Sequence, residues 1–483
     1  MTGGFEAQAP RRLRTSTNDN RHTVIVGNGM AATRLVEELV ARGHTDLTVL
    51  GDENHPPYNR ILLSAVLEGT HRPESLTLRE PEWYADHGVD LRLGARVLEL
   101  DRERREVMLV DGTTLGYDRL VLATGSIPTL PPIRGLVRMD GSLHPKVHAF
   151  RSLDDCQRLV AALPGARNAV VVGGGLLGLQ VSRALSVRGL ATEVVEGGEH
   201  LLRSQVGAPA GAVLERGLEQ LGTTVYTGAR AVRLNDDGLV LDNGFTLETD
   251  LVVLTAGGRP STALARRAGL TRRRGVVVDD QLRSVDDERI HAIGDCASHD
   301  GRTTGFVPPA WEQAGLVAAH LSGEKVSYRG SRSVTRLRAT GLDVAVLGDP
   351  ERTEGQVVEM TNPVVGTHRK LVVRDGVIVG ATLVGDLSRI GLLTQHYDRG
   401  TVLGPDEPGA LLLGDRPLQP AHLPDDAEIC ACAGVTAGRI RACGSLDEVT
   451  ETTRATTGCG GCAPAVRQLL ATRHRPTLEG TKR

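Results

Sequence analysis

The feature that most constrains the fold is a glycine-rich turn that occurs twice, each time directly after an apolar strand pattern. The first, TVIVGNGMAA, has glycine or alanine at Gly27, Gly29 and Ala32. The second, AVVVGGGLLG, has glycine at Gly173, Gly175 and Gly178. The first glycine of such a turn permits the bend, the second lets the backbone approach a pyrophosphate, and the small third residue packs helix against strand. Two copies predict an α/β protein with two Rossmann-like dinucleotide-binding domains.

An acidic residue follows the next strand pattern after each turn, where a ribose hydroxyl pair would bind. Asp52 follows the strand LTVL, and Glu196 ends the strand TEVVE. The carboxylate of Glu196 should accept from the ribose 2′-hydroxyl of NADH and repel the 2′-phosphate of NADPH. No arginine stands immediately beside Glu196 in the sequence. The second site is therefore expected to prefer NADH.

Length and charge limit the other possibilities. With 483 residues the chain is too long for one ordinary core, so two to four domains are expected. A formal net charge of −3 with mixed signs favours neither nucleic acid nor a membrane as partner. Residues 1–21 lack the apolar stretch of a secretory signal and are interpreted as a disordered tail. We therefore expect a cytoplasmic protein whose cysteines do not form disulfides.

The cysteines gather near the C-terminus. Four of the seven form the close pairs C-x-C and C-x-x-C, at Cys430, Cys432, Cys459 and Cys462. Two thiolates for each iron is what a [2Fe–2S] cluster requires, and the glycines of TTGCGGCAP leave backbone N–H groups free to face its sulfurs. Structural zinc is the alternative, although C-x-C is less usual there. Three other cysteines are not expected to be ligands: Cys443 between the pairs, and the isolated Cys156 and Cys296.

Further strand patterns end in glycine, at ATG in 118–128, TAGG in 250–260 and GD in 289–297. Together with the two turns, this array resembles the two-dinucleotide-binding flavoproteins, which include the ferredoxin and glutathione reductases. The resemblance implies FAD in the first site and NAD(P)H in the second. It also implies that Asp295, the aspartate of the GD motif, bonds the ribityl chain of the flavin.

The stretches YNRILLS (58–64), RSLDD (151–155) and WEQAGLVAAHLSG (311–323) resemble the branch that holds nitrite reductase large subunits and ferredoxin reductases. Relatives usually have glutamate after GLLGL, whereas this chain has Gln180, whose amide can still bond the nicotinamide carboxamide. The C-x₄-C pair of disulfide-type members is missing, so hydride should stop at the flavin. The resemblance implies FAD contacts at Gly27, Gly29, Ala32, Asp52, Arg60, Val97, Thr124, Gly125, Arg151 and Asp295.

The segment with the paired cysteines resembles the bacterioferritin-associated-ferredoxin-like domain of nitrite reductase large subunits. In that domain the cysteines that match Cys430, Cys432, Cys459 and Cys462 bind a [2Fe–2S] cluster. Short helices are expected around it.

The resemblance predicts a domain order along the whole chain. The FAD domain is discontinuous and contains the inserted NADH domain. A small α+β reductase C-terminal domain follows, which helps to cover the flavin or forms a homodimer. A linker then leads to a small helical [2Fe–2S] domain. The predicted bounds are 22–150 with 257–325 (FAD), 151–256 (NADH), 331–404 (small domain), 414–428 (linker) and 429–472 ([2Fe–2S]).

These observations predict an NADH-dependent electron-transfer flavoprotein that passes electrons from NADH through FAD and a [2Fe–2S] cluster to a partner. The chain reaches Arg483 without the sirohaem module of nitrite reductases, so it is not expected to reduce nitrite. Its architecture resembles the electron-transfer subunits of assimilatory nitrate reductases, which implies a molybdenum nitrate reductase catalytic subunit as partner.

Three alternatives remain open. The first is a ferredoxin or rubredoxin reductase, and the second is the flavoprotein subunit of an amine or opine dehydrogenase. The third is a regulator that senses iron or redox state and is not an enzyme. The intact second glycine turn with Glu196 weighs against the dehydrogenase subunit, which would not need a nicotinamide.

Overall fold

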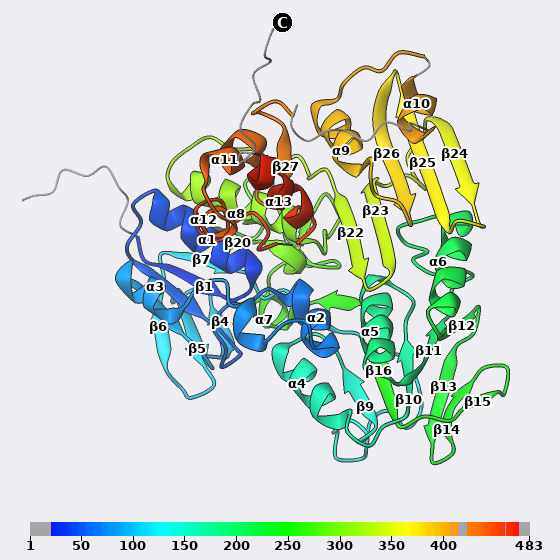
Figure 1. The fold of residues 1–483 in the computed structure, drawn as a ribbon. Coiled ribbons are helices and arrows are strands. Elements are labelled where there is room, and N and C mark those ends of the chain that lie inside the picture. The colour runs from blue at the N-terminus through cyan, green and yellow to red at the C-terminus, as the bar shows by residue number, and fades with distance from the viewer. Residues whose placement is uncertain (1–20, 406, 414–422, 459, 473–483) are drawn as a thin grey trace, which may run out of the picture.

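The computed structural model describes residues 21–405, 407–413, 423–458 and 460–472 (Figure 1). All but the last residue of the expected tail at 1–21 lies outside this part, as do residues 414–422 of the expected linker. No helix within the described ranges is long and apolar enough to cross a membrane.

The first Rossmann-like unit has a sheet with the order β21-β18-β19-β20-β7-β1-β2-β3 within the described residues. The neighbours β20, β7, β1, β2 and β3 run parallel. Residues of β1 and β2 are buried throughout, as is expected when both faces of a parallel sheet are covered. The strands come from two distant parts of the chain: β1 (Thr23–Val26), β2 (Leu47–Leu50), β3 (Val89–Arg92), β7 (Arg119–Leu122), then β18 (Val276–Val278), β19 (Arg283–Ser284), β20 (Asp287–Ala292) and β21 (Ala297–His299).

Helices α1 (Met30–Ala41) and α8 (Val307–Leu321) pack against each other beside this sheet (Figure 1). Two prolines stand in the first turn of α8, where the missing N–H of proline does little harm. The remaining elements of this unit are short: α2 (Leu63–Glu68), α3 (Pro81–Asp86), α7 (Ala263–Arg267), η1 (Arg60–Leu62), η2 (Pro73–Leu76), η3 (Gly294–Cys296), the sheet of β4 (Val97–Asp101), β5 (Glu106–Leu109) and β6 (Thr114–Gly116), and the pair β8 (Ser126–Pro128) with β17 (Gly258–Pro260).

The second Rossmann-like unit has a parallel sheet in the order β12-β11-β10-β16-β9 within the described residues. Strand β9 pairs with β16 although it precedes residue 151, the predicted start of the NADH domain. The predicted boundaries therefore stay an interpretation. The elements are β9 (Val147–Ala149), α4 (Leu153–Ala162), β10 (Asn168–Val172), α5 (Leu176–Val187), β11 (Ala191–Glu196), α6 (Ala208–Gln220), β12 (Thr223–Thr227) and β16 (Leu251–Leu254), with β13 (Ala231–Asn235), β14 (Gly238–Leu241) and β15 (Thr246–Leu247) in a small sheet.

An antiparallel sheet with the order β22-β23-β26-β25-β24 forms the next part of the chain and packs against α6 (Figure 1). A tight turn joins β25 and β26. Asp375 and Gly376 both have positive φ, at 50° and 76°, which suits a tight hairpin. The elements are β22 (Val334–Ala339), β23 (Leu342–Gly348), β24 (Gln356–Asn362), β25 (Thr367–Arg374), β26 (Val377–Val384), α9 (Ile390–Arg399) and α10 (Glu407–Leu413).

The cysteine-rich segment folds into short helices and one small strand pair, and it lies on the first unit beside α1 and α8 (Figure 1). Residues 423–428, which the sequence assigned to the linker, are bonded to its first helix. Arg441 of that helix donates to the Leu423 carbonyl at 2.6 Å. The elements are β27 (Glu428–Cys430), β28 (Val435–Thr436), α11 (Ala437–Ala442), α12 (Leu446–Thr453) and α13 (Ala463–Thr472).

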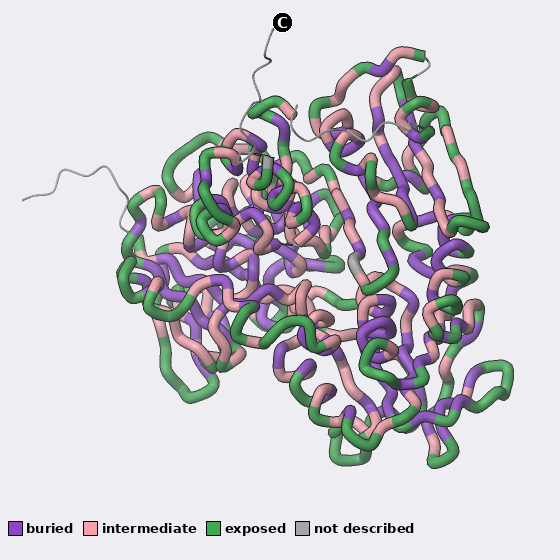
Figure 2. Tube along the Cα trace, viewed as in Figure 1, coloured by how far each residue is buried: buried purple, intermediate pink, exposed green. Residues whose placement is uncertain are grey.

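Buried residues run along both parallel sheets and also continue into the cysteine-rich segment (Figure 2). One apolar core combines residues of that segment with Met30, Leu78 and Trp311 of the first unit. The expected α/β class, with two Rossmann-like units, an α+β domain and a small helical domain, is confirmed.

Candidate functional site

The first glycine turn has the geometry that the motif predicts. Gly27 has a φ of +116°, and a Cβ atom there would lie 2.2 Å from the Ala123 carbonyl oxygen, so only glycine fits. Gly29 is the N-cap of α1 and supplies no side-chain cap, which leaves the first N–H groups of α1 available to a phosphate. Ala32 is fully buried where the helix meets the sheet.

Three of the predicted FAD residues form one polar cluster. Arg151 Nη2 lies 2.8 Å from Asp295 Oδ2, and Ser126 donates to the same oxygen at 2.6 Å. Arg60 Nη1 donates to the Arg151 carbonyl at 3.5 Å, and Arg60 Nε lies 4.0 Å from where a Cβ on Gly29 would be. Asp295 and Gly29 come shortly after the parallel strands β20 and β1, so the cluster lies at the carboxyl end of the sheet, where nucleotides bind.

Thr124 and Gly125 follow β7 at the same end of the sheet. The Thr124 hydroxyl donates to the Ser261 carbonyl at 2.8 Å, and the Gly125 carbonyl accepts from the Ser261 N–H at 2.9 Å. These bonds join the two segments that connect the units. Val97 begins β4 and packs, partly buried, against the core of the first sheet.

Asp52 does not face this cluster in the way that its sequence position suggests. Its side chain is 67% exposed and lies 3.9 Å from Arg96 Nε. The strand registers explain the difference. Val26 pairs with Leu50 and Val172 pairs with Val195, so the position equivalent to Glu196 is Gly51.

Glu53 is the acid that turns toward the cluster. Its carboxylate accepts from the Tyr58 hydroxyl at 2.7 Å and pairs with Arg60. Burial is the main cause that raises the pKa of Tyr58, so this hydroxyl stays protonated and keeps donating. Sequence reasoning missed Glu53. Two acidic residues follow β2, and the sequence alone does not indicate which of them turns toward the cluster.

The second glycine turn holds Glu196 tightly. The two carboxylate oxygens of Glu196 accept from the N–H groups of Gly174 and Gly198, each at 2.7 Å. A Cβ on Gly178 would lie 1.8 Å from the Gly173 carbonyl oxygen, so this close helix-to-strand contact requires glycine. The turn and the acid therefore form one rigid rim at the end of β11.

An arginine does lie beside Glu196 in space, although none is adjacent to it in the sequence. Arg203 Nε is 3.5 Å from Glu196 Oε1, because the Leu202 N–H bonds to the Gly174 carbonyl and brings this loop back to the turn. The Arg230 side chain passes close to Gly197. Neither arginine is adjacent to Glu196 in the chain, so sequence reasoning missed both. Gln180 is partly buried on α5, behind the same turn.

Three of the four paired cysteines lie together and are buried: Cys430, Cys432 and Cys462. Hydrogen bonds from the thiols of Cys432 and Cys462 lower the pKa of Cys430 well below its usual range, so a thiolate is favoured there. The Thr456 N–H donates to Cys462 Sγ at 3.2 Å. Cys459 lies outside the described residues. Within the described ranges alone, no three Cys, His, Asp or Glu side chains form a metal-binding group.

The other three cysteines are buried. Cys443 is buried in the same apolar core, and its thiol donates to the Arg439 carbonyl at 3.4 Å. Burial raises the pKa of Cys156 to about 12 and also raises the pKa of Cys296. Neither thiol is suited to carry electrons at neutral pH.

A small cavity opens onto the cysteine segment. Its walls are three cysteines, Pro308 from α8, and Val334 and Arg336 from β22. The thiols are therefore enclosed by the first unit and the antiparallel domain as well as by their own segment.

Comparison with protein families identifies the two glycine turns. The family model described as pyridine nucleotide-disulphide oxidoreductase matches residues 21–314, which include both turns and the polar cluster. The chain belongs to the pyridine nucleotide-disulphide oxidoreductase family. The rubredoxin NAD+ reductase C-terminal domain matches residues 334–400, and the BFD-like [2Fe-2S] binding domain matches residues 428–472.

Two relatives of this pyridine nucleotide-disulphide oxidoreductase are larger proteins named for nitrite and nitrate reduction. The nitrite reductase [NAD(P)H] of Bacillus subtilis is 35% identical, over 93% of this chain and 57% of that protein. The assimilatory nitrate reductase electron transfer subunit of the same organism is 32% identical, over 95% and 60%. The chain thus spans somewhat more than half the length of these relatives. A solved structure, the ferredoxin reductase for the CYP199A2 system from Rhodopseudomonas palustris, is 28% identical with a TM-score of 0.69, over 75% of this chain and 91% of that one.

These matches confirm the predicted cofactors, FAD, a nicotinamide nucleotide and a [2Fe–2S] cluster, and they show an NADH-dependent oxidoreductase. The described residues fit these groups. The open position beside Gly29 and the uncapped start of α1 suit a pyrophosphate, and three buried thiols, two of them hydrogen-bonded to the third, suit an iron–sulfur cluster rather than a hard cation. Which residues hold each group stays a prediction.

Proposed function

We propose that the chain is an electron-transfer flavoprotein of nitrate assimilation, which passes electrons from NADH through FAD and the [2Fe–2S] cluster to a cytoplasmic molybdenum nitrate reductase. The observation that carries the proposal is the position of the three thiols. Asn59, one residue before the predicted FAD ligand Arg60, donates to the Gly458 carbonyl at 2.6 Å, next to the C-x-x-C pair. This contact supports an electron path from the predicted flavin site to the paired cysteines, because it joins residues that neighbour both.

The bound groups supply the redox chemistry, since FAD accepts hydride from NADH and releases electrons singly, which a [2Fe–2S] cluster can take one at a time. The residues of the chain bind and orient these groups. The start of α1 and Arg60 would hold the FAD pyrophosphate, and Arg151 with Asp295 would hold the ribityl chain. Gly173 to Gly175 would bind the pyrophosphate of NADH, and Gln180 would form a hydrogen bond with the nicotinamide carboxamide.

No dithiol is needed in this scheme. Cys156 and Cys296 are buried, and their thiols donate to backbone carbonyls, at 3.4 Å for Cys156 and 3.2 Å for Cys296. The paired cysteines of the C-terminal segment therefore offer the electron path that the missing C-x₄-C pair would have provided.

The choice of nitrate reductase as acceptor is supported by the relative named as an assimilatory nitrate reductase electron transfer subunit. A homodimer through the antiparallel domain stays a prediction. Val364 and Val365 are exposed at the end of the β24–β25 hairpin and offer an apolar surface for it.

A ferredoxin or rubredoxin reductase is the second candidate, favoured by the likeness to the solved ferredoxin reductase. The dehydrogenase-subunit hypothesis is less well supported, because Glu196 is fixed by two N–H groups beside the second glycine turn, as a nicotinamide-nucleotide site would require. The regulator hypothesis lacks support in a chain of this enzyme family.

The test is to supply the purified holoprotein with NADH and to compare acceptors. When a molybdenum nitrate reductase subunit is added, we expect nitrate to be reduced to nitrite. This rate should be well above the rate of electron transfer to a ferredoxin or rubredoxin. Faster reduction of the small iron–sulfur proteins would favour the second candidate. Slow NADH oxidation with every acceptor, including ferricyanide, would contradict both.

A further inference from the structure

The cysteine-rich segment, residues 423–458 and 460–472, is packed onto the first unit through a shared apolar core. Met30, Leu78 and Trp311 of the first unit are buried in the same core as Val435, Ile440 and Val449 of the segment. Trp311 Nε1 donates to the Met30 carbonyl at 3.1 Å, which fixes the indole between α8 and α1. A Cβ on Gly458 would lie 3.7 Å from Trp311 and 2.8 Å from Cys432 Cβ. The cysteine loop therefore rests on Trp311.

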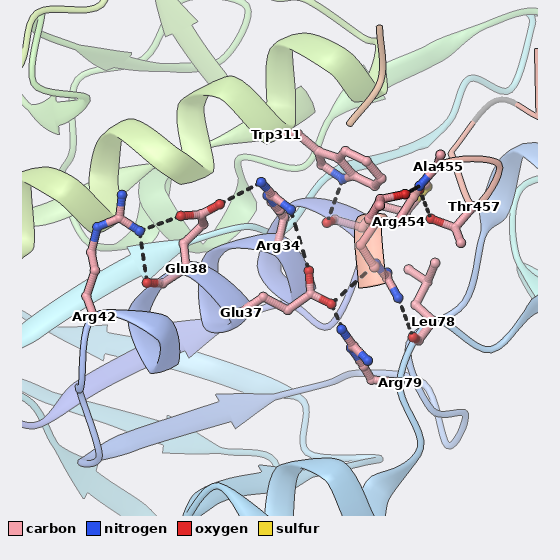
Figure 3. A network of polar contacts seen from close by, with 12 residues as sticks. Arg34, Glu37, Glu38, Arg42, Leu78, Arg79, Trp311, Arg454, Ala455 and Thr457 are labelled. Atoms are coloured by element: carbon pink, nitrogen blue, oxygen red, sulfur yellow. Dashed lines mark hydrogen bonds and ion pairs between the residues drawn. The ribbon is translucent and has the colours of Figure 1, made fainter. Parts of the chain in front are cut away.

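A partly buried carboxylate reaches across this contact (Figure 3). Glu37 of α1 is 11% exposed, and three arginines from different parts of the chain surround it. Arg79 Nε lies 2.8 Å from Glu37 Oε1, Arg454 Nε lies 3.5 Å from the same oxygen, and Arg34 lies 3.9 Å from Oε2. Only Arg454 among these comes from the cysteine-rich segment.

Arg454 is committed to this position. It ends α12 in the left-handed conformation with a φ of 62°, and its side chain is 11% exposed. Its Nη1 donates to the Leu78 carbonyl at 2.9 Å, while its own carbonyl accepts from the Thr457 hydroxyl at 2.8 Å. The side chain of Arg454 thus binds the first unit, and its backbone carbonyl forms a hydrogen bond within the cysteine loop.

The neighbouring acid provides a contrast. Glu38 follows Glu37 in α1, but its carboxylate pairs with Arg34 at 2.6 Å and with Arg42, both in or at the end of the same helix (Figure 3). Charge alone does not explain the contact with the segment, since Glu38 has the same charge and two arginine partners. Glu37 differs by being paired with a cation of the cysteine-rich segment.

We propose that Glu37 and Arg454 are positioning residues that hold the cysteine-rich segment in one docked position on its own flavin unit. Both groups are partly buried in the docked state, so removal of either charge would leave the other desolvated without this partner and would weaken docking. The cluster then receives electrons within the chain from a fixed place rather than by a swinging domain. This last step rests on the proposed function, whereas the docking does not.

The experiment compares Glu37→Gln with the matched control Glu38→Gln in the holoprotein. Backbone hydrogen exchange should become at least about tenfold faster at residues 454–458 and 76–79 in Glu37→Gln alone. After rapid mixing with NADH, cluster reduction should slow by at least about tenfold, while flavin reduction keeps its rate. Should Glu37→Gln lose its FAD, Arg454→Gln, which leaves α1 unchanged, must give the same exchange result.

Equal exchange in the two variants would overturn the docking role. Faster exchange with unchanged cluster reduction would overturn the claim that this position serves electron transfer. If NADH fails to reduce the cluster in the unmodified protein, the proposed function fails, and the exchange comparison still decides the docking.

Discussion

Arg203 Nε lies 3.5 Å from Glu196 Oε1, although seven positions separate the two residues in the chain. Arg203 is 65% exposed, whereas Glu196 is 14% exposed and is held by two backbone N–H groups. The rim of the second nucleotide site therefore has a fixed acid inside and a movable cation outside. An acid favours the ribose hydroxyl of NADH, and a nearby arginine can accommodate the 2′-phosphate of NADPH.

Replacement of Glu196 by alanine should narrow the preference for NADH over NADPH. The variant loses the bond to the ribose hydroxyl and the repulsion of the phosphate, which together are worth about 1–3 kcal/mol. Stopped-flow flavin reduction with each nucleotide measures the ratio of rates. Equal rates with both nucleotides in the unmodified protein would show that Glu196 does not discriminate.

Arg203→Ala should act in the opposite direction. With the cation removed, the Michaelis constant for NADPH should rise by roughly tenfold, while that for NADH changes little. Arg167→Ala is the control, because Arg167 is an exposed arginine just before β10, at the other end of the same sheet. A similar rise in both variants would point to a general loss of positive charge.

Cys462→Ser should remove most of the visible absorbance of the cluster, since a hydroxyl is a poor ligand for iron in such sites. Cys459→Ser is expected to do the same. FAD content and ferricyanide reduction should persist in both variants, because a small acceptor can react at the flavin. Cys443→Ser, in the same segment but outside the two cysteine pairs, should keep its iron. Loss of FAD together with iron would mean that the segment is part of the flavin fold.

Asp295→Ala should weaken FAD binding by roughly ten- to a hundredfold, because a charged group that accepts two hydrogen bonds disappears from the polar cluster. The dissociation constant can be measured by adding FAD to the apoprotein and following flavin fluorescence. Asp280→Ala is the control, since Asp280 pairs with His299 rather than with the cluster. Undiminished FAD affinity in Asp295→Ala would exclude the role given to Asp295.

His291 should make the protein less stable in acid. Burial lowers its pKa to about 3, with further lowering by His320 and by Arg119 and Arg283. Between about pH 6.5 and 3 the unfolded chain binds a proton that the folded chain refuses, so stability falls as the pH drops, by at most about 1.4 kcal/mol per unit. In denaturant titrations, His291→Leu should flatten this dependence, and the exposed His71→Leu should not. An unchanged slope in His291→Leu would contradict the assignment.

The sequence was sufficient where local backbone geometry decides the outcome. The strands TVIV and LTVL and the turns at Gly27 and Gly173 were predicted because glycine spacing and apolar runs constrain short segments directly. The acidic residues after β2 show the limit, because the strand register that makes Gly51 equivalent to Glu196 is set by pairing between distant segments.

The folding of long loops and the docking of one unit on another could not be predicted from the sequence either. Arg203 reaches Glu196 only because the loop after β11 returns to the glycine turn. The bond from Asn59 to Gly458 joins residues 399 positions apart, and no periodic pattern indicates it. Such contacts depend on shape complementarity between finished units rather than on local propensity.

The interleaved order of the strands affects how the protein can be made on the ribosome. Every strand of the second parallel sheet, from β9 to β16, emerges in one uninterrupted stretch, whereas the first sheet lacks β20 until that whole stretch has been synthesised. At usual elongation rates the half-built first sheet, with β7 uncovered along one edge, waits roughly ten to thirty seconds for its partner strand. The second Rossmann-like unit is thus able to fold first, and the first unit can be completed only late in translation.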